Sequence, residues 1–423
     1  MSIVDPLHPT VEARLMPKAW LFVFLLSIVG CLNYLDRIMI TTMRSSIIEA
    51  IPMTDTQFGL LTSVFLWVYG ILSPIGGFLA DRFKRTHVIL GSLFLWSIVT
   101  WLTAHATTFN ELLATRALMG ISEACYIPAA LAFITDYHKG STRSLAVGFH
   151  MVGVISGQAL GFVGGWMAEM HAWNYAFNFF GIVGILYAAF LVFVLKEAPD
   201  RKLNPVMEEK RAPGVSFRHA IVNLFSHRGF VVALVFWGLL GIVGWLIVGW
   251  LPTYYKEQFN LTQSVAGLYA TGYLYTSSMV GVLVGGAVAD KWSKTNPRAR
   301  ILFPAIGLLI AAPGIFLAST TTVVMVAVAG FTLFAFTKSF TDANMMPILC
   351  MVSDPRYRAT GYGVLNLFSC IIGGIGLYVG GVLRDANVNL SVMFMVAGVS
   401  TITCGLLLFF LKPNKKAELR DTD

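Results

Sequence analysis

The sequence predicts an all-α polytopic membrane protein, with twelve transmembrane helices in two six-helix bundles and both termini in the cytoplasm. Three observations support this fold class: 56% of the 423 residues are hydrophobic, only 12% are charged, and the mean hydropathy is +0.72. A soluble globular protein carries roughly 25% charged residues. An ordinary soluble enzyme is therefore excluded, because its domains would lack the charged surface that keeps them in solution.

Apolar runs of spanning length occur twelve times in the chain. A bilayer core needs about 20 mostly apolar residues per helix, and charged residues, prolines or Asn/Gly clusters bound each run. The predicted spans are residues 19–43, 57–80, 86–106, 110–132, 145–168, 175–195, 228–250, 265–288, 300–318, 322–350, 360–384 and 391–411. A polar segment precedes the first run, so we expect no cleavable signal peptide.

Positive charges fall on one side of the predicted membrane. Of the 30 basic residues, 24 lie in the termini and in the connections from even to odd spans, and three lie within spans. The opposite loops hold only Arg44, Lys256 and Arg384. The positive-inside rule therefore predicts cytoplasmic termini. We expect a multi-pass protein of the plasma (inner) membrane, whose net charge of +8 follows the membrane and indicates no nucleic-acid partner.

The longest polar interruption divides the chain into two halves. The predicted organisation is a cytoplasmic N-terminus (1–18), an N-terminal bundle (19–195), a cytoplasmic linker (196–227), a C-terminal bundle (228–411) and a cytoplasmic tail (412–423). The loop after span two reads GGFLADRFKR and the loop after span eight reads GGAVADKWSK, so Asp81 and Asp290 stand 209 residues apart. This spacing indicates an internal duplication, a common plan of secondary transporters.

Both of these loops combine glycines with an aspartate and basic residues. Glycines let helices approach closely, and a charge network at the cytoplasmic mouth can hold one conformation shut. The residues assigned to such gating are Gly77, Asp81, Arg82, Arg85, Gly286, Asp290 and Lys291. Alternatively, the basic residues only fix the orientation in the membrane, but orientation does not require the aspartates.

Charged residues within spans are the candidate functional residues, because each costs about 2.5 to 3.5 kcal/mol at the bilayer centre. They are Asp36 and Arg37 in span one, Arg116 and Glu123 in span four, and Lys338 and Asp342 in span ten. Arg116 and Glu123 are two helical turns apart and can face one cavity, whereas Asp36 and Arg37 point about 100° apart. The i, i+4 spacing in span ten allows a self-neutralising structural pair as well as a functional one.

Arginine and carboxylate side chains suit different tasks in such a site. Arg37 and Arg116 are predicted to clamp an anion, because guanidinium keeps its proton and binds carboxylates bidentately; alternatively, each only balances a buried carboxylate. Asp36 and Glu123 are predicted to take up and release protons, with Asp342 as a third candidate. The proton is thus the expected coupling ion, and no cofactor or metal is expected.

Proline and aromatic residues indicate helix shape and membrane depth. Pro128 and Pro347 lie at equivalent depths in spans four and ten and are predicted to kink these helices. Trp245, Trp250 and Tyr254 lie near the outer end of the 228–250 span. We expect them to be mostly interfacial anchors; alternatively, they line the outer vestibule.

The duplicated plan and its two loops resemble the major facilitator superfamily over nearly the whole chain. The usual loop of that family is G-x-L-A-D-R-x-G-R-[KR], against GFLADRFKRT here, so Lys84 replaces a glycine and Thr86 the last basic residue. NYLDR in span one, and an Arg and a Glu seven residues apart in span four, look like the anion:cation symporter group. That group includes hexuronate, galactonate and phthalate permeases and vesicular glutamate and sialate carriers.

The resemblance assigns roles to individual residues. It implies that Tyr34, Arg37 and Arg116 recognise an anion, and that Asp36 and Glu123 handle protons. Gln158 and Asn366 lie in segments similar to those that contact sugar hydroxyls in sugar-acid carriers, although polar residues in Gly-rich helices also join helices together. With Lys338, these residues complete the predicted substrate-binding set.

The expected function is proton-coupled symport of an organic anion, such as a sugar acid or small carboxylate, by a monomer in the bilayer. Spinster-like exporters of lysolipids or other amphiphiles are the alternative, because they share the NY-x-DR and R-x6-EA patterns and tolerate a residue such as Lys84. Polar residues of the second half, including Lys338 and Asn366, favour a small polar solute. A membrane enzyme or sensor would need a soluble catalytic domain or a metal-ligand motif, and neither is visible, so no enzymatic activity is expected.

Overall fold

All regular secondary structure in the computed structural model is helical, over the described residues 18–138, 142–198, 217–354 and 357–411. The first half contains α1 (Ala19–Thr42), α2 (Arg44–Ala50), α3 (Asp55–Arg82), α4 (Arg85–Thr103), α5 (Phe109–Glu123), α6 (Tyr126–Tyr137), α7 (Arg143–Ala159), α8 (Phe162–Met170) and α9 (Trp173–Val194). The second half contains α11 (Phe217–Ser226), α12 (Arg228–Gln258), α13 (Gln263–Gly267), the π-helical η3 (Leu268–Tyr273), α14 (Leu274–Ser293), α15 (Ala299–Thr320), α16 (Val324–Val352), α17 (Arg358–Asp385) and α18 (Leu390–Phe410).

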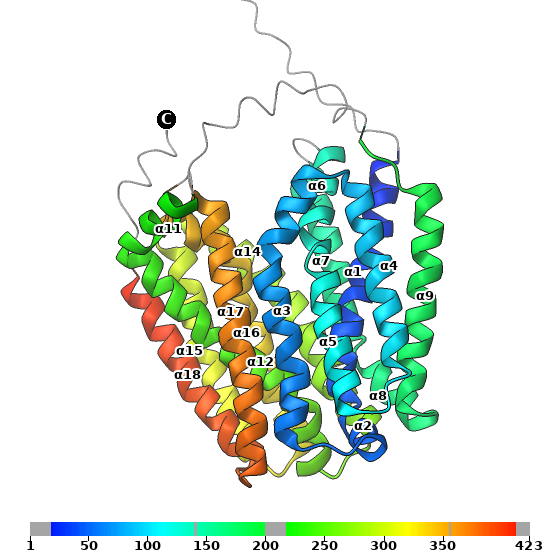
Figure 1. The fold of residues 1–423 in the computed structure, drawn as a ribbon. Helices are drawn as coiled ribbons and strands as arrows, with labels where there is room; N and C mark the ends of the chain where they lie inside the picture. The colour runs from blue at the N-terminus through cyan, green and yellow to red at the C-terminus, as the bar shows by residue number, and fades with distance from the viewer. Residues whose placement is uncertain (1–17, 139–141, 199–216, 355–356, 412–423) are drawn as a thin grey trace, which may run out of the picture.

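The twelve predicted spans are confirmed. The described residues contain twelve helical stretches long and apolar enough to cross a membrane. Helices α5 and α6 together form the fourth, α7 and α8 the fifth, and α13, η3 and α14 the eighth. Figure 1 shows the two halves as bundles that stand side by side, with α3 and α17 next to each other. Helix α16 runs through Pro347 without interruption.

The two ends of the molecule are named here by charge. The basic face is the end at which α3 and α14 finish, where the sequence places most positive charges; the opposite face carries the α1–α3 and α17–α18 connections. Near the opposite face the bundles bond directly to each other. Ser63 Oγ donates to the Gly374 carbonyl at 2.7 Å, and Trp67 Nε1 donates to the Ile371 carbonyl at 3.0 Å. These bonds fasten α3 to α17 over the half of the helices toward the opposite face.

Buried apolar side chains form three clusters, and only the cluster near the opposite face joins the two bundles. One cluster, which includes Phe58 and Trp250, is shared by both bundles and lies toward the opposite face. The other two lie toward the basic face, one around Trp96 in the first bundle and one around Phe230 in the second. The bundles are therefore packed into one core at the opposite face and into separate cores at the basic face.

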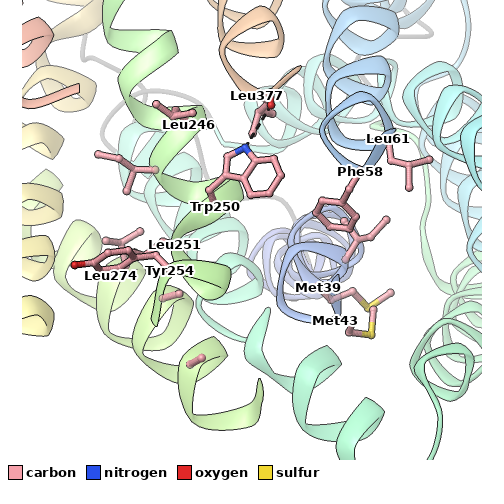
Figure 2. Packing of buried hydrophobic residues seen from close by; sticks show 14 of the residues in the cluster. Met39, Met43, Phe58, Leu61, Leu246, Trp250, Leu251, Tyr254, Leu274 and Leu377 are labelled. Carbon is pink, nitrogen blue, oxygen red and sulfur yellow. Dashed lines mark hydrogen bonds between the residues drawn. The ribbon is translucent and has the colours of Figure 1, made fainter. Parts of the chain in front are cut away.

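Trp250 occupies the centre of the shared cluster (Figure 2). Its indole donates to the Leu377 carbonyl at 3.3 Å, and its ring lies edge-on to Phe58 at 6.0 Å between centroids. Trp250 and Tyr254 are each only 1% exposed. The expectation that they anchor the membrane interface is wrong, because α12 continues to Gln258 and both rings turn inward. Trp250 lies in the contact between bundles, whereas Tyr254 packs inside the second bundle, where its hydroxyl donates to the Ala318 carbonyl at 2.8 Å.

Close packing of α7 on α1 predicts that Gly157 tolerates no larger residue. A β-carbon on Gly157 would lie 2.1 Å from the Cys31 carbonyl oxygen, whereas Gly148 on the same helix faces open space. We expect Gly157→Leu to lower the melting temperature of the detergent-solubilised protein by several degrees, since overpacking costs about 1–3 kcal/mol. Gly148→Leu is the matched control and should melt like the wild type. Equal melting of both variants would contradict this packing.

Candidate functional site

A buried ion pair joins α1 to α5. Arg37 Nη2 lies 2.8 Å from Glu123 Oε2, and the two side chains are 4% and 0% exposed. The Arg37 guanidinium also lies over three aromatic rings, at 4.3 Å from the centroid of Tyr34, 4.7 Å from Phe65 and 4.5 Å from Tyr69. Such cation–π contacts attract a desolvated guanidinium strongly. Arg37 is therefore held between one carboxylate and an aromatic cage.

Arg116 is buried without an ion pair among the described residues. It lies two turns before Glu123 on α5 and is 1% exposed. Its Nη1 contacts the Met119 thioether at 3.1 Å, and its guanidinium lies 5.1 Å from the Phe65 centroid. A thioether is a weak acceptor, and a guanidinium cannot shed its charge. Arg116 thus keeps a positive charge that an anion can satisfy.

Asp36 points away from Arg37, as the 100° offset predicts. Its Oδ2 accepts a hydrogen bond from Thr100 Oγ1 of α4 at 3.0 Å, while its Oδ1 has no hydrogen-bond partner in the described part of the chain. Asp36 is 2% exposed and lies within electrostatic range of Glu123 and Arg116. The four groups therefore form one buried cluster, whose net charge is zero with both carboxylates ionised and +1 with one protonated.

The fourth span breaks directly after Glu123. Helix α5 ends at Glu123 and α6 begins at Tyr126. Pro128 has no amide N–H and so cannot bond to the carbonyl of Ala124, four residues earlier. Gly76 of α3 packs against this carbonyl, since a β-carbon there would lie 2.4 Å from its oxygen. The predicted kink at Pro128 is thus a break that leaves Glu123 at the end of a helix, inside the buried cluster.

The second bundle contains the ion pair between Lys338 and Asp342 that their i, i+4 spacing predicts. Lys338 Nζ lies 2.8 and 2.9 Å from the Asp342 oxygens, and the two side chains are 25% and 45% exposed. Tyr275 and Tyr362 are each within electrostatic range of both Asp342 and Tyr34. The pair therefore faces the same interior as the buried cluster of the first bundle.

A small cavity separates the bundles beside the two arginines. Its lining includes Arg37 and Arg116 from the first bundle and Trp245 and Leu377 from the second. Its volume of about 20 Å³ is enough for a single water molecule. Binding of an organic anion within this cavity therefore requires the bundles to move apart here.

Gln158 and Asn366 are not brought into this cluster. Gln158 lies on α7 and Asn366 on α17, and both side chains are half-buried. In the described part of the chain, no hydrogen bond joins either side chain to the buried charges. Their assignment to the substrate site stays a prediction.

The charged residues of the two loop motifs pair within their own bundles. Arg85 forms an ion pair with Asp136 of α6 and donates to the Ala132 carbonyl. Asp290 of α14 pairs with Arg300 of α15 at 3.0 Å. Within the described ranges, neither ion pair crosses between the bundles. The predicted charge network across the basic face is therefore not formed by these groups in this conformation.

The remaining gating residues lie close to the same face. Arg82 and Lys291 are exposed. Gly77 has open space around it, and the nearest atom to a β-carbon on Gly286 would be 4.0 Å away. The Asp81 side chain lies outside the described residues, although its backbone belongs to α3. The gating role of these residues stays a prediction.

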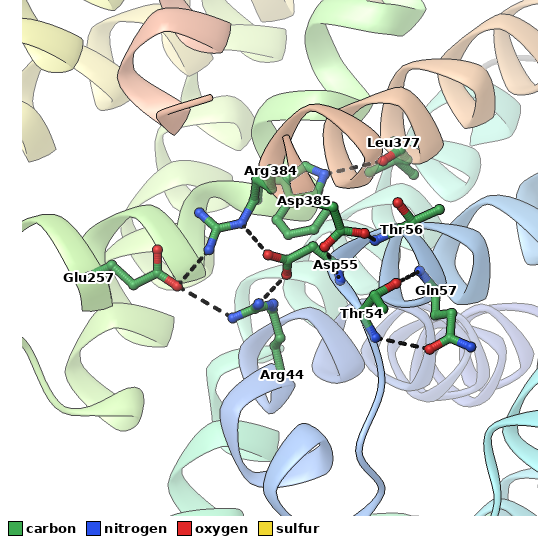
Figure 3. A network of polar contacts seen from close by, with 10 residues as sticks. Arg44, Thr54, Asp55, Thr56, Gln57, Glu257, Leu377, Arg384 and Asp385 are labelled. Carbon is green, nitrogen blue, oxygen red and sulfur yellow. Dashed lines mark hydrogen bonds and ion pairs between the residues drawn. The ribbon is translucent and has the colours of Figure 1, made fainter. Parts of the chain in front are cut away.

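At the opposite face, a ring of four charges joins the bundles (Figure 3). Asp55, at the start of α3, pairs with Arg44 and, at 3.0 Å, with Arg384 of α17. Glu257 of α12 lies 2.9 Å from Arg384 and 3.4 Å from Arg44. Each arginine thus contacts one carboxylate from each bundle, so the ring holds this face closed.

Two further carboxylates cross between the bundles beside this ring. Asp385 accepts hydrogen bonds from the backbone N–H groups of Asp55 and Thr56, both at 2.9 Å, and so caps α3 from the other bundle. Glu169 accepts a bond from the Gln263 N–H at 2.7 Å. Such acceptors satisfy the free N–H groups at a helix start. Closure at this face therefore uses both ion pairs and helix caps.

Neither this ring nor the full buried cluster is predicted by the sequence. Arg44 and Arg384 are two of the three basic residues on the sparsely charged side, and this exception to the charge pattern was the available signal. Thr100 and Phe65 carry no comparable signal, since neither is charged. Only the fold brings them next to Asp36 and Arg37.

Two bundles around a buried cluster of charges define a polytopic membrane protein of the secondary-transporter class. The sequence profile of the Major Facilitator Superfamily matches residues 26–377 and 305–422. The chain belongs to this superfamily and is a transporter of that fold, as the resemblance implied.

Relatives within the superfamily differ in what their names say they transport. The chain is 28% identical to Protein spinster homolog 1 of Xenopus tropicalis, over 86% of this chain and 72% of the relative. It is 25% identical to the Probable sulfoacetate transporter SauU of Cupriavidus necator, over 90% of each. A crystal structure of a bacterial homolog to the human lysosomal transporter Spinster, inward-facing and unoccupied, has a TM-score of 0.74 at 22% identity, covering 93% and 95% of the two chains. This last likeness shows the fold alone.

The ring at the opposite face predicts how access to the interior changes when it is weakened. Asp55→Asn removes the carboxylate that pairs with both Arg44 and Arg384, so the opposite face should open more often. We expect faster labelling of a single cysteine at Thr62, which lines the small cavity, by a membrane-impermeant maleimide added from that face. Glu49→Gln, an exposed change on α2, is the control. Unchanged labelling of the Asp55→Asn protein would show that the ring does not hold this face closed.

Proposed function

We propose that the protein is a proton-coupled transporter of an organic anion in the plasma (inner) membrane. The observation that carries this proposal is Arg116, a fully buried guanidinium with no ion pair among the described residues. A buried, unpaired charge is costly, and an anionic ligand relieves that cost. A carboxylate, sulfonate or phosphate group bound between Arg116 and Arg37 would receive charge-assisted, bidentate hydrogen bonds.

Coupling to protons follows from the charge of the buried cluster. With Asp36 and Glu123 both ionised, the cluster is neutral and attracts an anion weakly. Protonation of either carboxylate leaves a net charge of +1, which favours anion binding. Protonation of Glu123 also weakens its ion pair with Arg37 and makes that guanidinium available. Proton and anion would therefore bind together, which is the requirement for symport.

Alternating access would exchange the face at which the two bundles share an apolar core for the face at which their cores are separate. In the described conformation, the bundles share a core at the opposite face and have separate cores at the basic face. This arrangement supports an inward-facing state, given the predicted orientation. A rigid-body rocking motion would break the ring of Arg44, Asp55, Glu257 and Arg384 and bring the two loop motifs together.

Export of a lysolipid or similar amphiphile is the second candidate. The identity of 28% to a spinster homolog over most of this chain favours it. Such a substrate could also carry an anionic head to Arg116, so the buried cluster suits both candidates. The sulfoacetate transporter among the relatives and the Lys338–Asp342 pair favour a small polar anion.

Transport assays with a panel of substrates test this proposal. Proteoliposomes containing the protein should accumulate at least one uronate, aldonate, sulfonate or dicarboxylate, and an inward proton gradient should raise the uptake. Arg116→Gln should lower the uptake rate at low substrate concentration by about 100-fold, since a lost charged hydrogen bond costs about 1.5–3 kcal/mol. Arg143→Gln, an exposed change, should leave it intact. Translocation of lysolipids without any anion uptake would favour the second candidate.

Replacement of Glu123 separates proton coupling from anion exchange. Glu123→Gln keeps the shape of the side chain but removes both its charge and its titration. We expect loss of accumulation driven by a pH gradient, while counterflow exchange of the same anion continues, because the arginines remain in place. The comparison is made in proteoliposomes with radiolabelled substrate on both sides. Undiminished pH-driven uptake would exclude Glu123 as the coupling group.

A further inference from the structure

An apolar groove lies on the outside of the first bundle, away from the buried cluster. It runs between α3, α4 and α5 and has a volume of about 400 Å³. Its lining includes Phe83, Leu95, Leu118 and Ile121, which are each about half exposed. Gly91 deepens the groove, because no atom lies within 4 Å of the position of a β-carbon there. The hollow is large enough to accept part of a hydrocarbon chain.

The position of the groove limits what can occupy it. Apart from Phe83, which directly follows α3 at the basic face, its lining residues belong to membrane-spanning helices and reach Val99 and Leu118 further along α4 and α5. At this depth the groove faces the hydrocarbon core of the bilayer and not water. A flexible acyl chain can fill this hollow by van der Waals packing, whereas a polar ligand would leave its hydrogen-bonding groups unsatisfied there. The natural occupant is therefore an acyl chain of the bilayer.

Charges at the end of the groove select the head group. Arg82 and Lys84 flank Phe83, and both are exposed at the basic face. Neither takes part in an ion pair within the described residues, whereas the neighbouring Arg85 is paired with Asp136. Basic residues next to the end of a span attract anionic lipid head groups.

We propose that the groove binds one anionic phospholipid from the leaflet at the basic face, with its acyl chain over Gly91 and its phosphate at Arg82 and Lys84. This lipid is a resident ligand and not the transported substrate. Ser122 and Cys125 line the groove on either side of Glu123, and Ser92 Oγ donates to the Ser122 carbonyl. The bound chain thus packs against the break in the fourth span from outside, opposite the buried charges.

Native mass spectrometry of the full chain tests the site directly. The probes are dioleoylphosphatidylglycerol and dioleoylphosphatidylcholine, added in turn to delipidated protein in detergent. The wild type should retain one phosphatidylglycerol. Gly91→Phe fills the hollow and should reduce this retention at least tenfold, whereas Gly148→Phe, at the equally open position on α7, should not. Lys84→Gln should reduce the preference for phosphatidylglycerol about fivefold and leave phosphatidylcholine binding unchanged.

Alkylation of a natural cysteine gives a test without any substitution in the groove. Cys125 lines it, so phosphatidylglycerol should slow the reaction of Cys125 with N-ethylmaleimide, followed by peptide mass spectrometry. Equal lipid retention by wild type and Gly91→Phe, together with unprotected Cys125, would overturn the proposal. Protection of Cys125 that depends on protein concentration and accompanies dimers would also overturn it, because a second copy of the chain would then cover the groove.

Discussion

The ion pair between Arg37 and Glu123 is the interaction around which the first bundle is arranged. Removing two such charges from water costs several kcal/mol for each ion, and a well-packed apolar pair would give comparable or better stability. The bundle instead surrounds Arg37 with Tyr34, Phe65 and Tyr69 and places Glu123 at a helix end. These features keep the two charges shielded from solvent and within ion-pair distance. They would serve the proposed transport, in which the anion and the proton compete for the same charges.

Closure of the opposite face depends on interactions of a different kind. The ring of Arg44, Asp55, Glu257 and Arg384 is partly exposed, and such ion pairs contribute little net stability in water. Most of the stabilisation comes from the shared apolar cluster around Trp250. The ring sets the alignment of the bundles, because like charges would meet if the helices shifted. The ring therefore fixes how the bundles meet at this face, and its low net stability would let the face open again.

The sequence predicts the architecture well because hydropathy and charge asymmetry are properties of each segment alone. All twelve spans follow from them. The superfamily is found from the repeated loop motif, which is also a local pattern. Periodicity within single helices also predicts that Asp36 and Arg37 diverge and that Lys338 meets Asp342. Contacts between helices are a different matter. The partner of Arg37, the burial of Trp250 and the pairing of Arg384 with Asp55 depend on how helices far apart in the chain are packed, and no local pattern contains that information.

Proton-coupled transport requires the buried cluster to bind a proton and an anion together. The most direct measurement is proton uptake when a transported anion is added to the purified protein in weakly buffered solution, followed with a pH indicator at a pH at which the unliganded cluster is neutral. We expect uptake of about one proton for each anion bound, and no uptake by a protein that carries Gln in place of Glu123. Stoichiometric anion binding without proton uptake by the wild type would show that the cluster does not bind the two together.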